Sequence, residues 1–102
     1  MKIRTFDFPK FEEWYKTPNK LWEQEIGKYS CLICEMLGTR GYEDVFYSFE
    51  ISYKVAPYNR HYIFCARIKA EKSYEEIKAW FEQSVVKAAK TWENEITPYI
   101  AE

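Results

Sequence analysis

Residues 45–70 read VFYSFEISYKVAPYNRHYIFCARIKA, and this stretch decides the fold class. Its first half alternates apolar with polar residues, which is typical of a strand with one buried face. The apolar set comprises Val45, Tyr47, Phe49, Ile51, Tyr53 and Val55. Pro57 and Asn59 favour a turn. The return strand then places Tyr62, Phe64, Ala66, Ile68 and Ala70 on one face. The stretch therefore predicts an antiparallel β-hairpin.

The register of this hairpin follows from its two apolar sets, because cross-strand neighbours point to the same face of a sheet. A loop over residues 57–60 brings the two apolar sets opposite each other. It pairs Val55 with Tyr62, Tyr53 with Phe64, Ile51 with Ala66 and Phe49 with Ile68. The same register sets Glu50 opposite Arg67 on the outer face, where their opposite charges attract.

A long C-terminal helix follows the hairpin. Ser73 and Glu76 have the spacing of a capping box, and the helix is expected to end near Ile96, before Thr97-Pro98. Its apolar stripe comprises Tyr74, Ile77, Phe81, Val85, Ala88, Ala89, Trp92 and Ile96. Trp80 lies off this stripe, among polar residues.

The N-terminal third offers weaker signals. Residues 1–8 alternate loosely and predict a short strand near a sheet edge. Pro9 then fits the first turn of a short helix carrying Phe11, Trp14 and Tyr15. Residues 21–37 fit a helix capped by Gly38 better than a strand, because Glu35 interrupts the apolar face of the strand. The alternative is a helix that ends near Gly27, followed by a third strand over residues 28–37.

Together these elements predict a single α+β domain over residues 1–102. Its antiparallel hairpin sheet, with three strands expected, has helices packed on one face, including the long C-terminal one. A chain of 102 residues forms one domain. No apolar run approaches the roughly 20 residues of a membrane-spanning helix. The N-terminal residues lack a signal-peptide pattern, and three cysteines form no secreted framework, so we expect a cytoplasmic protein.

Catalytic, metal and cofactor chemistry find little support in the sequence. Cys31 and Cys34 form a C-x-x-C pair, but His61 and Cys65 are separated by roughly 13 Å along one strand, too far to share an ion. There is one histidine and no nucleophile elbow. The acidic residues that are adjacent in the sequence, such as Glu12-Glu13, Glu75-Glu76 and Glu43-Asp44, are typical of solvated helix starts and loops. We therefore expect no enzyme activity, no metal and no cofactor.

The remaining signal is an aromatic content of 20%. The alternation and the helix stripe assign Tyr47, Phe49, Tyr53, Tyr62, Phe64, Phe81 and Trp92 to the core, together with Trp22 and Tyr29. Rings outside these patterns, together with nearby cations, predict a partner-binding set: Phe46, Lys54, Tyr58, Arg60, Arg67 and Trp80. Aromatic residues combined with arginine are typical of interface hot spots.

These features favour a small non-catalytic protein–protein interaction module. It would be an adaptor or an inhibitor that docks on a larger protein, for example one carried by a mobile element. The alternative is nucleic-acid binding by ring stacking with Arg40, Arg60 and Arg67, although the net charge of −1 gives no electrostatic steering. Self-association as a homodimer, through the C-terminal helix or a sheet edge, is compatible with the first hypothesis.

Overall fold

A computed structural model describes residues 5–38 and 44–96 of the chain. The elements follow in the order α1 (Phe11–Tyr15), β1 (Trp22–Ile26), β2 (Tyr29–Leu37), β3 (Val45–Ala56), β4 (Asn59–Lys69) and α2 (Tyr74–Thr91). A 3-10 turn at Pro18–Lys20 links α1 to β1, and a π-helical turn at Trp92–Ile96 continues α2. The predicted helix from Ser73 to Ile96 is thus confirmed.

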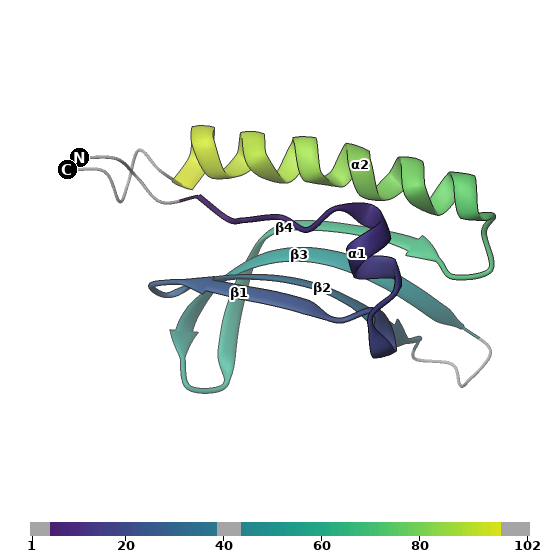
Figure 1. Cartoon of the computed structure of the whole chain (residues 1–102). Helices are drawn as coiled ribbons and strands as arrows, with labels where there is room; N and C mark the ends of the chain where they lie inside the picture. Colours follow the sequence, from purple (N-terminus) through teal and green to yellow (C-terminus); the bar gives the residue numbers. More distant parts are fainter. Residues whose placement is uncertain (1–4, 39–43, 97–102) are drawn as a thin grey trace.

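The strands form one antiparallel sheet in the order β1-β2-β3-β4. Helices α1 and α2 lie on the same face of this sheet (Figure 1). No other described element covers the opposite face. The predicted α+β class, with an antiparallel sheet and a long C-terminal helix, is confirmed. The sheet has four strands rather than the three that the sequence predicted. None of the described helices is both long enough and apolar enough to cross a membrane.

The helix predicted over residues 21–37 is wrong, because this segment is the β1–β2 hairpin. The alternative is right only in its strand over residues 28–37, because the helix that it placed before Gly27 is strand β1. The error has a physical cause. Strand β2 is apolar on both faces, and a nearly continuous apolar run fits the helical and the extended template alike. The tight turn needs a positive φ, which Gly27 supplies at 60°.

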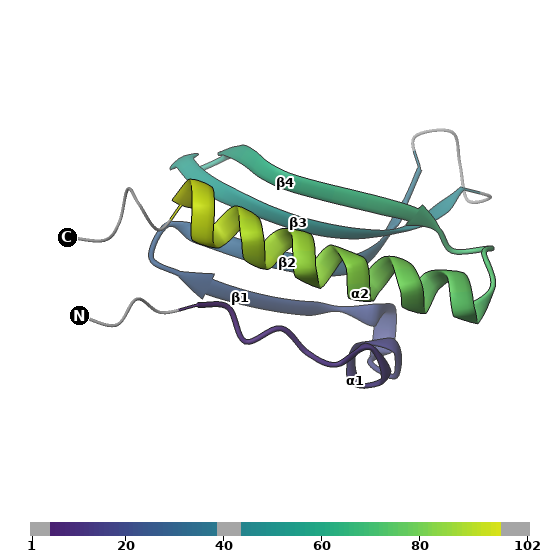
Figure 2. The same cartoon turned by 90° about the horizontal axis from the view of Figure 1, so that it is seen from above.

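The N-terminal segment lies beside β1 without joining the sheet (Figure 2). Residues 5–8 belong to no strand, so the predicted N-terminal strand is not found there, and residues 1–4 lie outside the described ranges. Side chains hold this segment instead. The Asp7 backbone N–H donates to Gln24 Oε1 at 2.7 Å, and Gln24 Nε2 donates to Asp7 Oδ2 at 3.3 Å. The segment therefore flanks the β1 edge.

The β3–β4 register differs by two residues from the predicted one. The turn contains only Pro57 and Tyr58, and Phe49 pairs with Ala66. A shift by an even number preserves the faces, so Tyr47, Phe49 and Ile51 are still buried. A bulge then leaves Ile63 unpaired and sets Tyr62 opposite Ser52, on the outer face.

Two residues assigned to the core are therefore exposed. Tyr62 is 57% exposed and Val55 is 58% exposed. Within α2, Tyr74 and Ala89 also lie at exposed margins of the predicted stripe. Most of the aromatic residues nevertheless build the interior, as the sequence predicted.

Trp14 lies at the centre of this interior. Its indole stacks on Phe81 with ring centroids 5.1 Å apart and meets Tyr47 edge-on at 5.4 Å. Its Nε1 donates to the Lys20 carbonyl at 2.6 Å and to the Ile33 carbonyl at 3.3 Å. One side chain of α1 thereby ties the helical layer to β2 and to the turn that precedes β1.

The start of α2 has the predicted cap. The Ser73 hydroxyl accepts from the Glu76 backbone N–H at 3.2 Å and also lies 3.2 Å from the Glu76 carboxylate. The cap ends the β4–α2 connection at a defined residue and so directs α2 back across the sheet.

Candidate interaction surface

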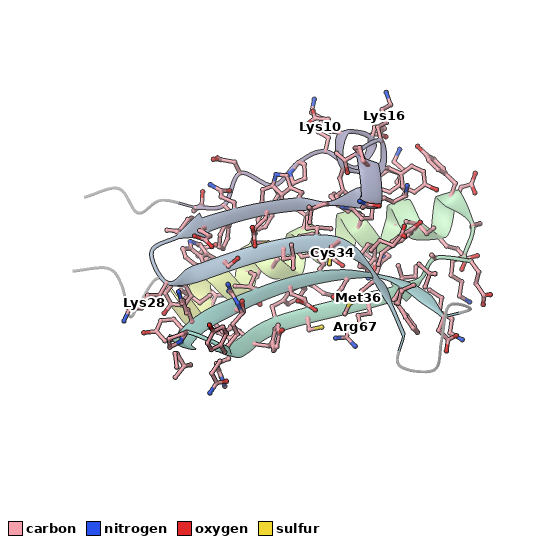
Figure 3. All side chains as sticks on the ribbon, turned by 90° about the horizontal axis from the view of Figure 1, so that it is seen from below. Lys10, Lys16, Lys28, Cys34, Met36 and Arg67 are labelled. Atoms are coloured by element: carbon pink, nitrogen blue, oxygen red, sulfur yellow. The ribbon has the colours of Figure 1, made fainter. Side chains whose placement is uncertain are left out.

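The sheet face opposite the helices is termed the open face. Register and alternation place the following side chains on it: Glu23 and Glu25 from β1; Ser30, Leu32, Cys34 and Met36 from β2; Phe46, Ser48, Glu50, Ser52 and Lys54 from β3; and Arg60, Tyr62, Cys65, Arg67 and Lys69 from β4. Figure 3 views this face directly and labels Cys34, Met36 and Arg67 on it.

The structure brings most of the predicted partner-binding residues to one side of the molecule. Phe46, Lys54, Arg60 and Arg67 lie on the open face. Tyr58 lies in the β3–β4 turn at the end of that face, and its side chain is fully exposed (103%).

Trp80 does not join this group, because it belongs to α2 in the other layer. It is half-buried, and its ring contacts Trp14 and Phe81 at centroid distances of 6.2 and 6.4 Å. Its indole nitrogen is buried without a hydrogen-bond partner among the described residues. Trp80 therefore packs at the margin of the core, whereas the sequence placed it on the surface.

A buried carboxylate lies in the middle of the open face. Glu50 is only 7% exposed; its Oε1 accepts a hydrogen bond from Ser48 Oγ at 2.7 Å and lies 3.7 Å from Arg67 Nη2. A buried charge needs such partners. The predicted attraction between Glu50 and Arg67 is confirmed, although the two residues are diagonal neighbours, since Glu50 pairs with Cys65.

The tip of the β3–β4 hairpin projects past the β1–β2 turn. The last backbone bond between the two joins Lys54 N–H to the Lys28 carbonyl at 2.9 Å. Figure 1 shows the tip curling away from α2. A cleft of about 420 Å³ lies in the step between the two turns, and its charged lining residues are Glu25, Lys28, Lys54 and Arg60. The hairpin tip therefore has an excess of positive charge.

The cysteines are not placed for shared chemistry. Cys31 points into the core and Cys34 onto the open face, because they are three residues apart on a strand. Burial raises the pKa of the Cys31 thiol well above its usual range. Burial and, second, the Glu50 charge raise the pKa of Cys34. Within residues 5–38 and 44–96, no three His, Cys, Asp or Glu side chains gather as metal ligands.

The other shifted pKa values belong to structural contacts. A hydrogen bond from its own backbone lowers the pKa of Glu12, and its contact with Lys78, at 3.3 Å, lowers it further. The same contact raises the pKa of Lys78 and links α1 to α2 at the surface. Burial, followed by the nearby Tyr15 and Glu35, raises the pKa of Tyr47. None of these groups lies on the open face.

Comparison of the chain with protein-family models, with curated proteins and with solved structures gives no match. The open face and the hairpin tip are the candidate functional surfaces of the described residues. Sequence reasoning missed Tyr62, which the bulge turns outward. It also missed the apolar row of β2 on the open face, whose signal was the nearly continuous apolar character of residues 29–37, broken only by Ser30 and Glu35. Arg40 lies outside the described residues.

Proposed function

We propose that this protein is a non-catalytic, cytoplasmic binding module that docks on a larger protein through the tip of its β3–β4 hairpin. The observation that carries the proposal is the full exposure of Tyr58 at the end of a projecting hairpin. Lys54 and Arg60 flank it on the paired strands. An exposed tyrosine between cations supports a docking role as an adaptor or an inhibitor.

The physical reason is that tyrosine offers a large contact area for the loss of few rotatable bonds. A two-residue turn also holds its backbone before binding, which lowers the ordering cost of association. The cations around the tip favour an acidic surface on the partner. Hot-spot side chains of this kind cost about 2 kcal/mol or more on truncation, which is roughly a thirtyfold loss of affinity.

The proposal is tested by affinity capture from a lysate of the source cells. The bait would be the wild type, the double variant Tyr58→Ser/Arg60→Ser, or the control Val86→Ser, which removes an exposed apolar side chain from the far side of α2. We expect a defined protein to be retained by the wild type and by the control and lost from the double variant. Equal capture by all three baits, or capture by none, contradicts docking through the tip.

A second candidate function is nucleic-acid binding, which one observation favours. Strand β4 exposes Tyr62 between Arg60 and Arg67 on the open face, an arrangement suited to stacking a base while contacting its phosphates. Fluorescence anisotropy with a labelled single-stranded oligonucleotide tests it. Affinity that falls steeply with salt and is lost in Tyr62→Ser supports this function. No binding at low salt excludes it.

A further inference from the structure

Strand β2 is mostly apolar on both of its faces, with Ser30 on the open face and Glu35 on the other. Toward the helices it presents Tyr29, Cys31 and Ile33, and toward the open face it presents Leu32, Cys34 and Met36. A strand that is apolar on both sides is typical of one covered on both sides. Helices α1 and α2 cover only one side (Figure 1). Phe46 continues the apolar row beside Met36, so the centre of the open face has the composition of a contact surface.

Glu50 and Lys54 lie on the inner strand β3 of the open face, and its other charged residues lie on the two edge strands. Glu23 and Glu25 lie on β1, whereas Arg60, Arg67 and Lys69 lie on β4. The apolar row of β2 runs between the two edges. This surface is complementary to itself: a second copy, turned by a two-fold axis parallel to the strands, places its β1 over the first copy's β4 and its β4 over the first copy's β1.

We propose that the open face binds the open face of a second copy, giving an isologous dimer with two stacked sheets. Glu23 lies in the same cross-strand row as Cys65, one row from Arg67. Glu25 lies in the row of Tyr62, one row from Arg60. Arginine side chains span one row, and stacked sheets also rotate by about 30°. Each edge therefore brings acidic side chains within reach of basic ones.

The area of the face agrees with such a contact. Four strands about 4.8 Å apart and about 30 Å long cover on the order of 600 Å² in projection. Standard interfaces bury about 800 Å² per partner, so this contact belongs to the small class of interfaces, and we expect the dimer to depend on concentration.

Other ways of joining two copies fit less well. A two-fold axis across the strands would stack β1 on β1 and β4 on β4. Acidic side chains would then face acidic ones, and basic side chains would face basic ones, so both edges would repel. Pairing of two β4 edges would bring their basic side chains close together, and the bulge at Ile63 disrupts that edge. The predicted association through α2 would use a shallow outer surface whose five lining residues are Glu82, Gln83, Val86, Lys87 and Lys90, so that three charged side chains would be covered there.

The dimer also has a geometric consequence. A two-fold axis parallel to the strands leaves both copies pointing the same way, so both hairpin tips emerge at the same end. The proposed partner would then meet two copies of Tyr58, which favours bivalent binding. The dimer itself does not depend on the proposed function.

Sedimentation velocity and light scattering on the purified full chain test the dimer, over about 5 to about 500 µM and at low and high salt. We expect a twofold increase in mass with concentration, opposed by salt. Two variants reverse one edge each: Glu23→Lys/Glu25→Lys and Arg60→Glu/Lys69→Glu. Each variant should remain monomeric, because its β1 and β4 edges then carry charge of the same sign. An equimolar mixture of the two should dimerise, because the β1 edge of each variant then faces a β4 edge of opposite charge on the other. The control Glu13→Lys/Glu71→Lys makes the same change in charge as the first of these variants, away from the open face, and should dimerise like the wild type.

The outcomes are distinct. A wild type that stays monomeric over this range overturns the proposal, as does dimerisation of either single-edge variant alone. Failure of the mixture to associate, with both variants folded by circular dichroism, also overturns it. The measurement involves no partner, so it is independent of the capture experiment with Tyr58→Ser/Arg60→Ser.

Discussion

Replacing Trp14 by phenylalanine should destabilise the protein far more than the same replacement at Trp80. Both indoles are part of one cluster, and their ring centroids lie 6.2 Å apart. They differ in their N–H groups. Trp14 donates to the carbonyls of Lys20 and Ile33, whereas the buried N–H of Trp80 has no acceptor among the residues that the structure describes.

The magnitude follows from this difference. At Trp14, which is 1% exposed, the lost ring atoms cost about 1 kcal/mol in transfer and about 1 kcal/mol for the cavity. Depriving the Lys20 carbonyl of its donor adds about 1–2 kcal/mol, giving about 3–4 kcal/mol. At Trp80 the ring is half-buried, and removing an unsatisfied donor offsets the loss of about 1 kcal/mol in packing. We therefore expect a difference of about 3 kcal/mol between the two variants.

Urea unfolding followed by far-ultraviolet circular dichroism measures this difference without relying on tryptophan fluorescence. With a slope of about 1.2 kcal/mol per molar, the two midpoints should differ by about 2.5 M. A difference below about 0.8 M, or a Trp80→Phe variant as unstable as Trp14→Phe, would show that the indole hydrogen bonds do not anchor α1 to the sheet.

Three further changes have defined outcomes. Gly27→Ala should cost about 1 kcal/mol in urea unfolding, because φ is positive there; nothing lies near the added methyl group, so Gly27→Asn should cost less. Ser73→Ala should lower stability by about 1 kcal/mol through loss of the cap, seen as a fall of several degrees in Tm. Burial raises the pKa of the Cys31 thiol. The stability that the buried neutral thiol contributes is therefore complete below its unfolded pKa of about 8.5. Above that pH the free energy of unfolding falls, by up to about 1.4 kcal/mol per pH unit. Between about pH 8.5 and 10, the free energy of urea unfolding should therefore fall less for Cys31→Ala than for the wild type or the exposed control Cys65→Ala. Parallel plots of this free energy against pH for all three proteins would refute the link to the Cys31 thiol.

The parts of the fold that the sequence predicted are those with an unambiguous period. Strand β3 alternates over eleven residues and α2 has an apolar stripe with a capping serine, so local patterns sufficed for both. Strand β2 could not be identified with the same certainty, because apolar side chains on both faces erase the alternation that distinguishes a strand from a helix. Only its pairing with β1 and β3 decides that residues 29–37 are extended.

The candidate surface was predictable in part. Tyr58 follows Pro57 in a turn, which made its exposure an expectation from local chemistry. Trp80 looked exposed because helical periodicity alone cannot show that a neighbouring layer reaches round to cover it. Tyr62 looked buried because alternation alone cannot show a bulge, which depends on how two strands share one extra residue.

The sequence by itself determined that residues 45–70 form a hairpin, that Glu50 attracts Arg67 and that a helical segment runs from Ser73 to Ile96, because each depends on residues close together in the chain or on one alternating pattern. It did not determine the register of the hairpin. The tertiary structure decided the β1–β2 hairpin, the packing of Trp80 and the composition of the open face. These depend on which segments lie side by side. The separation of acidic and basic side chains at opposite edges of the open face exists only once four strands from different parts of the chain lie in one sheet, and no single stretch of sequence contains it.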